Sequence, residues 1–349
     1  MTRSIPDEAR LDFALTLRRR WADSVYPRLR AEYDAARAGE LTETPAGNTA
    51  AIVHALPSFG SFAWLERGSQ KLLWRAVGDA VDHQLSAASA TAGESTLTLD
   101  ADLALPDWYT DWDIHLQPGG VWSSDRAARV YELGARLVML GENDDYAFHR
   151  LFTASSVPER DYRCIVDLGC GFGKSTFSLK QKYPQAEVIG IDLAAPGLRL
   201  AVQRANDLGL RIQFRQSEAT ATNLASGTAD LVTSTMLLHE LPLKVLPRLF
   251  AEAARLLSPG GLLRFLDFQF TGDEFRDLAM TEHGTRNNEP YLAPMMKSDV
   301  IGMAQAAGLR SVRWRAFDER GRGLLDDLKW PARREWHFPW AVLEAEQPA

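Results

Sequence analysis

The chain has 349 residues, of which 46% are hydrophobic and 24% charged, and its formal net charge is −7. This length favours two domains or one large domain with a cap, and the acidic balance argues against binding to phosphate backbones, which depends on clustered lysine and arginine. Two cysteines without disulfide or zinc spacing, no long apolar run and a charged N-terminus predict a cytoplasmic protein with neither nucleic acid nor membrane as a partner.

The first third of the chain has a helical pattern. Between Pro6 and about Val81, apolar residues such as Leu11 and Leu15 recur at near-helical spacing. Residues 85–96 contain few large side chains, which predicts a linker or an exposed loop. We therefore expect a mainly helical N-terminal region that ends near residue 120.

The rest of the chain alternates between two patterns. One more helix is expected over residues 126–140, and short β-rich segments then alternate with helical segments of 10 to 15 residues, which predicts a parallel, doubly wound α/β sheet. The last two β-rich segments have no convincing helix between them, so we expect an antiparallel pair. The β-rich segments are "RCIVDLG", "AEVIGIDL", "RIQFRQ", "ADLVTST", "GGLLRFLDF", "LRSVRWRAF" and "WHFPWAVLEAE".

The segment "DLGCGFGKST", residues 167–176, resembles two nucleotide-binding loops without matching either. A P-loop needs glycine where Leu168 stands, and the third glycine of a dinucleotide fingerprint falls on Lys174, which we expect to be a solvated residue of the next helix. Closely spaced glycines after a strand still let the backbone approach a ligand, and an acidic residue there favours positive charge. The residues that remain informative are Asp167, Gly169, Gly171 and Gly173.

A second acidic residue ends the next β-rich segment. Asp192 in "VIGIDL" follows Asp167 by 25 residues, where a carboxylate can accept hydrogen bonds from both hydroxyls of a ribose. The alternative is that Asp192 merely ends a strand or caps a helix. Together the two segments indicate an adenosyl ligand with a charged amino-acid tail.

With these motifs the chain resembles the class I S-adenosylmethionine-dependent methyltransferases of the small-molecule type. "QSEATATNL", "ADLVTSTMLLHELP" and "LLSPGGLLRFLDF" follow in that family's order and spacing. Glu218 stands where aspartate is commoner, so the adenine contact is expected through the Ala219 amide. The resemblance assigns S-adenosyl-L-methionine binding to Asp167, Gly169, Cys170, Gly171, Gly173, Asp192, Leu193, Glu218, Ala219 and Thr235.

The resemblance also implies an architecture. It predicts a Rossmann-like sheet of seven strands, mostly parallel with an antiparallel last strand, over residues 121–349. Residues 1–120 would form a mainly helical cap over the substrate site. Lid insertions are expected at about 268–297 and 318–334.

Candidate catalytic residues lie in two segments. His239 follows the fourth strand and has an unperturbed pKa near neutrality, so it is a candidate general base, while Glu240 reads as a charge at a helix start. In "PDWYTDWDIHLQPGGVW", residues 106–122, an extended chain would place Asp113 and His115 on one face as an acid/base pair or metal ligands. A helix would break up that face, and the plain alternative is an amphipathic cap edge. We expect no metal.

Aromatic and flexible residues indicate where an acceptor binds. Many tryptophans fall in the N-terminal region, which fits a packed core or a pocket for an apolar or aromatic acceptor. The expected lid over residues 268–297 carries further candidates, although an ordinary surface loop is equally compatible. The expected acceptor contacts are Trp112, Trp122, Tyr291 and Met295, with His283 beside them.

The leading hypothesis is methyl transfer to oxygen, nitrogen or carbon of a small apolar or aromatic metabolite, as in secondary-metabolite biosynthesis. Methylation of protein or RNA is the second hypothesis, weakened by the acidic charge. The third is a member of the fold that binds the cofactor without methylating, as a cyclase, a decarboxylase or a regulatory partner. A homo-oligomer is left open.

Overall fold

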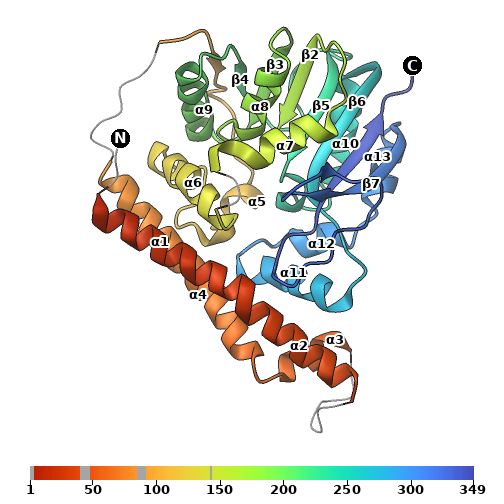
Figure 1. The fold of residues 1–349 in the computed structure, drawn as a ribbon. Coiled ribbons are helices and arrows are strands. Elements are labelled where there is room, and N and C mark those ends of the chain that lie inside the picture. The colour runs from red at the N-terminus through yellow and green to blue at the C-terminus, as the bar shows by residue number, and fades with distance from the viewer. Residues whose placement is uncertain (1–3, 40–47, 85–91, 142–143) are drawn as a thin grey trace.

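The computed structural model describes residues 4–39, 48–84, 92–141 and 144–349, and it contains an α/β sheet beside a helical N-terminal arm (Figure 1). The strands are β1 (Thr96–Thr98), β2 (Cys164–Leu168), β3 (Glu187–Asp192), β4 (Gln213–Gln216), β5 (Ala229–Thr235), β6 (Leu257–Phe268), β7 (Arg310–Asp318), β8 (Gly323–Leu324) and β9 (Trp340–Glu346). The helices are α1 (Ile5–Arg20), α2 (Tyr26–Arg37), α3 (Thr49–Ala55), α4 (Phe59–Asp82), α5 (Asp107–Thr110), α6 (Asp125–Val138), α7 (Ala147–Ser156), α8 (Lys174–Lys182), α9 (Ala195–Asp207), α10 (Leu246–Leu256), α11 (Glu274–Arg286), α12 (Leu292–Met296) and α13 (Val300–Ala306).

The sheet has the strand order β1-β4-β3-β2-β5-β6-β9-β7-β8. The five strands from β4 through β3, β2 and β5 to β6 pair in parallel. Strand β9 lies between β6 and β7 and is antiparallel to both. The predicted seven-stranded sheet with an antiparallel last strand is therefore confirmed. The short strands β1 and β8 extend it at the two edges, and β1 pairs with β4 although it precedes residue 120.

The central strands are buried on both faces, which explains their continuous apolar sequences. Every residue of β2 and of β5 is buried. Alternate residues of β2 serve two separate cores: Ile165 packs on the side of α8 and α9, and Val166 packs on the side of α10. This two-sided cover leaves the ends of the strands as the place for a site.

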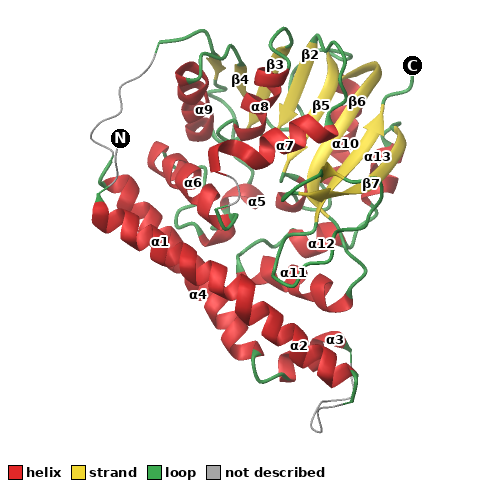
Figure 2. Cartoon of the chain, in the orientation of Figure 1, coloured by secondary structure: helices red, strands yellow, loops and turns green. Residues whose placement is uncertain are grey.

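The N-terminal arm is helical in the part that the structure describes before Asp82 (Figure 2). Helix α1 begins at the N-cap Ser4, whose hydroxyl accepts from the Asp7 amide, and carries proline in its first turn, as helix starts favour. A π-helical turn, Trp21–Val25, joins α1 to α2. The predicted linker over 85–96 lies mostly outside the described residues, and its last residue begins β1.

Helix α4 connects the arm to the rest of the molecule by packing closely on α6. A Cβ atom on Gly134 of α6 would lie 2.0 Å from the Trp74 ring, so only glycine allows this approach. The Trp74 indole N–H donates to the His115 carbonyl at 2.5 Å, and the Gln70 amide donates to the same oxygen at 3.0 Å. The arm thus holds the segment around His115 in place.

Candidate active site

Two adjoining cavities lie at the carboxyl ends of β2, β3 and β5. Five residues line both of them: Tyr109, Gly169, Asp192, Leu237 and Glu240. The first cavity is also lined by Leu193, Ser217, Glu218 and Ala219, and we call it the adenine cavity. The second, which we call the main cavity, is also lined by Cys170, Gly171, Thr235 and many apolar side chains of the cap and of β6 and β9.

The glycine loop forms the wall between β2 and α8. Gly169 has φ +68° and Gly171 has φ +55°, a region that favours glycine. A Cβ atom on Gly169 would lie 2.8 Å from Leu237, which also lines both cavities. The loop therefore needs glycine both for its turn and for its closeness to the opposite wall.

Asp192 lines both cavities, and each of its oxygens accepts a hydrogen bond from a backbone amide. Its Oδ2 accepts from the Gly171 amide at 2.7 Å and its Oδ1 accepts from the Ala194 amide at 2.8 Å. A carboxylate has about four acceptor positions, so both oxygens can accept further bonds. Burial raises the pKa of Asp192, and the backbone donors act against this rise.

Asp167 and Gly173 do not line either cavity. Asp167 is fully buried and accepts hydrogen bonds from the hydroxyls of Ser175 (2.6 Å), Thr176 (2.7 Å) and Thr233 (3.0 Å). Burial raises its pKa to about 6. The carboxylate thus anchors the start of α8 to β2.

Imidazole and carboxylate groups alternate along one side of the main cavity. The His239 Nδ1 lies 2.7 Å from Asp267 Oδ1, and its Nε2 lies 3.4 Å from Glu240 Oε1. The same Oε1 lies 3.3 Å from the Nε2 of His115, whose Nδ1 lies 2.9 Å from Glu289 Oε1. The network joins the ends of β5 and β6 to the cap and to the segment after α11.

The network shifts the pKa values of three of its members. Neighbouring carboxylates raise the pKa of His115 to about 9 and hold that of His239 well above 6.5, although burial opposes both shifts. The two imidazoles lower the pKa of Glu240 to about 2 against the effect of burial. A raised pKa favours the imidazolium form of His239, which argues against its predicted role as a general base.

Glu240 has one oxygen that the network does not use. Its Oε2 is buried and has no hydrogen-bond partner among the described residues. Glu240 itself lines both cavities. The expectation that Glu240 is only a helix-start charge is wrong, since its position and its partners are those of a site residue.

A third histidine that lines the main cavity also pairs with a carboxylate. His283 of α11 lines the cavity, and its Nδ1 lies 2.5 Å from Glu66 Oε1 of α4. Glu66 is buried and also pairs with Arg286. The sequence predicts His283 near the acceptor. It does not predict the pairing with Glu66, because the two residues are 217 positions apart.

The segment 106–122 is neither extended nor one helix. It contains the short helix α5, and His115 and Leu116 have φ +58° and +61°. The Asp113 carboxylate accepts from the Gly119 amide at 3.0 Å and does not line either cavity. The expected pairing of Asp113 with His115 is wrong, because the left-handed turn separates their side chains.

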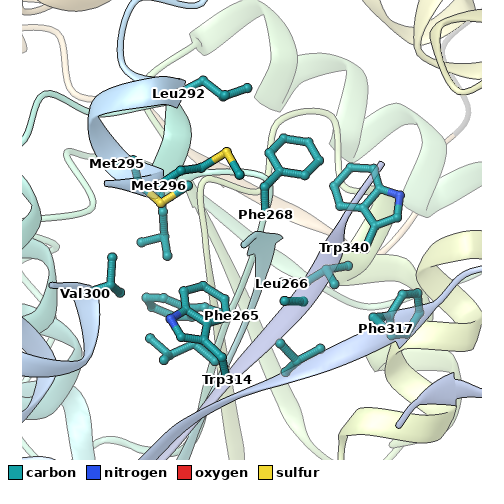
Figure 3. Packing of buried hydrophobic residues seen from close by; sticks show 14 of the residues in the cluster. Phe265, Leu266, Phe268, Leu292, Met295, Met296, Val300, Trp314, Phe317 and Trp340 are labelled. Atoms are coloured by element: carbon teal, nitrogen blue, oxygen red, sulfur yellow. The ribbon is translucent and has the colours of Figure 1, made fainter. Parts of the chain in front are cut away.

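The four expected acceptor contacts lie outside the lining of both cavities. Met295 is 1% exposed and packs among the buried residues of α12, β6 and β7 (Figure 3). Trp112 is 42% exposed. Trp122 is half-buried, and the Tyr291 hydroxyl donates to the carbonyl of Trp108, which lines the adenine cavity. Tyr291 therefore supports the site indirectly.

Lys174 is buried, not solvated as expected. Lys174 is 9% exposed and lines the main cavity. Burial lowers the pKa of its ammonium group to about 8. A basic residue in a glycine loop gives no sign of which way its side chain turns. Asp267 was also missed, although an acidic residue inside the apolar segment "GGLLRFLDF" is a usable signal.

Within residues 4–39, 48–84, 92–141 and 144–349, no three histidine, cysteine, aspartate or glutamate side chains are arranged to hold a metal ion. None of the helices in the same ranges combines the length and the apolar character needed to cross a membrane.

Part of the chain is similar to known methyltransferases. Residues 165–261 match the family model of a methyltransferase domain. A trans-aconitate 2-methyltransferase of Deinococcus radiodurans is 41% identical over 107 residues, which are 31% of this chain and 38% of the relative. A demethylmenaquinone methyltransferase of Thermus thermophilus is 32% identical over 138 residues, 40% of this chain and 60% of the relative.

These relatives are matched over less than two thirds of their own length. Among solved structures, that of Haemonchus contortus phosphoethanolamine N-methyltransferase 2 in complex with S-adenosylhomocysteine is 16% identical. Its alignment covers 70% of this chain and 61% of that chain, with a TM-score of 0.49.

Proposed function

Because residues 165–261 form a class I S-adenosylmethionine-dependent methyltransferase domain, we propose that the protein transfers the cofactor's methyl group to a small, largely apolar or aromatic metabolite. The observation that carries this proposal is the main cavity, where apolar side chains of the cap and of the sheet surround the Glu240 network. A largely apolar cavity with a few polar groups suits a small acceptor better than a macromolecular surface.

The residues that fit the cofactor are those around the two cavities. Glu218 and Ala219 would hold adenine, and Asp192 would accept from the ribose hydroxyls. Gly169 and Gly171 would let the backbone approach the methionine tail. When bound, the sulfonium supplies an intrinsically electrophilic methyl group, so the protein's task is to align the acceptor and to exclude water.

Glu240 is the group that we assign to the acceptor. Its unpartnered Oε2 can accept a hydrogen bond from an acceptor O–H or N–H and so orient the nucleophile. A carboxylate with a pKa near 2 is a weak base. It can still take the proton as bond formation to the methyl group makes that proton acidic. His115 and His239 then position Glu240 and stabilise its charge.

The N-terminal region is proposed to act as a cap over the acceptor. Trp74 of α4, His115 and Val121 line the main cavity together with the α6 residues Tyr131 and Val138. Residues 1–120 would thereby contribute to acceptor choice, and the inserted segment with α11 would close the cavity through His283. The residues that line the main cavity support this division into a cap and a catalytic domain.

The experiment is an assay of the purified protein with isotopically labelled S-adenosylmethionine and fractionated small-molecule extracts. We expect S-adenosylhomocysteine release together with a product that gains one labelled methyl group, detected by mass spectrometry. Label found only in added protein or RNA would contradict the small-molecule proposal. Tight cofactor binding without release of S-adenosylhomocysteine under any condition would instead identify a non-methylating member of the fold.

A further inference from the structure

Lys174 stands in the glycine loop without a charged partner. It is the first residue of α8, and its Nζ lies 5.2 Å from the ring centroids of both Tyr131 and Phe172. Over the four described ranges of the chain, no carboxylate lies within ion-pair distance of this ammonium group. The side chain lines the main cavity and is nine-tenths buried.

This placement is unfavourable in the free protein. Burial without a counter-ion disfavours the charged form of lysine, and the pKa of Lys174 falls to about 8. The first turn of a helix also carries a partial positive charge, which disfavours a cation there. Cation–π contacts with two rings offset only part of this cost. An anionic ligand in the main cavity would remove each disadvantage.

The position of Tyr131 indicates which part of a ligand lies there. A Cβ atom on Gly171 would lie 3.9 Å from Tyr131 Cε1, so this ring borders the glycine loop as well as the ammonium group. Gly171 in turn donates to Asp192, the expected ribose-binding residue. The tail that extends from the ribose of S-adenosylmethionine past Gly171 carries an α-carboxylate, which is an anion of the required size.

We propose that Lys174 binds the carboxylate of the cofactor's methionine tail. Tyr131 and Phe172 would hold the ammonium group in the cavity until this carboxylate arrives, and the lysine would then make a charge-assisted hydrogen bond. Lys174 can hold the tail whether or not the methyl group is transferred, so the binding experiment can fail while the proposed methyl transfer stands.

The test compares two ligands that differ in this tail. S-Adenosylhomocysteine carries the carboxylate, and 5′-methylthioadenosine has the same adenosine and sulfur without the amino-acid part. Calorimetric titration of Lys174→Met should show about ten- to hundredfold weaker binding of S-adenosylhomocysteine, because a hydrogen bond to a charged group is lost. Binding of 5′-methylthioadenosine should change by less than about threefold, a difference under 1 kcal/mol.

Two further variants sharpen the result. Lys174→Arg keeps the charge and should recover part of the affinity for S-adenosylhomocysteine. Lys297→Met removes an equal charge from an exposed lysine after α12 and should alter neither affinity. Equal weakening of both ligands by Lys174→Met would mean a structural role and overturn the proposal. No change for either ligand would assign the anion to the acceptor and overturn it as well.

Discussion

The cofactor end and the acceptor end that we propose for the site are built in different ways. The adenine and ribose end consists of backbone amides, glycines and one carboxylate, Asp192, at the ends of neighbouring parallel strands. The acceptor end consists of histidine–carboxylate pairs, and the pairs of His115 and His283 join segments more than 170 residues apart in sequence. The cofactor end therefore depends on local backbone geometry, whereas the acceptor end depends on docking of the cap.

The largest expected effect concerns the cofactor end. Asp192→Ala removes the carboxylate that we assign to the ribose and that also accepts from Gly171, so S-adenosylhomocysteine binding should weaken several hundredfold, by about 3–4 kcal/mol. Titration calorimetry measures this loss. Asp125→Ala removes a carboxylate exposed on α6 and serves as the control. An affinity for S-adenosylhomocysteine that survives in the Asp192 variant would refute the ribose assignment.

The next effect separates the two ends. Glu240→Gln keeps the shape of the side chain but loses the charge that pairs with both histidines. Turnover should fall about a hundredfold, roughly 3 kcal/mol, because the acceptor is no longer oriented by a carboxylate. S-Adenosylhomocysteine affinity should change by less than about threefold. Steady-state kinetics and titration of the same preparation test both statements, and a variant with normal turnover contradicts the role given to Glu240.

A third prediction uses the pH dependence of stability at the acceptor end. The pKa of His115 is raised to about 9 in the folded state, so the folded protein binds more protons than the unfolded chain between pH 6.5 and 9. The stabilisation is complete below pH 6.5 and is lost as the pH rises through 9. Urea unfolding should show about 3 kcal/mol less stability at pH 9 than at pH 6 attributable to His115.

His115→Gln serves as the reference for this measurement. Its free energy of unfolding should depend less on pH across the same window, while Lys174, which lies outside the network, contributes to both proteins alike. Identical pH profiles for the two proteins would show that the His115 network does not stabilise the fold.

The smallest effect tests the docking of the arm. Gly134→Ala would force Trp74 away from α6 and should cost about 1–2 kcal/mol of stability, because overpacking outweighs the gain in helix propensity. Gly68→Ala in α4 meets no atom within 4 Å and should stabilise the protein by up to about 1 kcal/mol. Thermal unfolding compares them, and effects of equal sign would contradict the packing described for α4 and α6.

The cofactor end could be predicted from the sequence because its signals are local. Glycine spacing after β2 and Asp192 at the end of β3 identify the loop and the strand edge without knowledge of distant contacts. Even there, the sequence does not predict that Asp167 accepts hydrogen bonds from Ser175 and Thr176. The spacing of residues does not show which way a buried carboxylate points.

The acceptor end could not be predicted, for a physical reason. Glu66 and His283 meet only because α4 and α11 pack side by side, and Glu240 gains its partners only when His115 is turned by a left-handed backbone. Met295 and Trp112 have types common in ligand pockets, yet Met295 packs in the core and Trp112 is exposed. Residue type alone does not separate these outcomes.

The most direct measurement is a crystal structure with S-adenosylhomocysteine. The account predicts adenine in the cavity at Ala219, ribose hydroxyls on Asp192, the sulfur near Glu240 and the tail carboxylate on Lys174. Adenine bound instead among the apolar cap residues of the main cavity, with Asp192 free of the ribose, would contradict it.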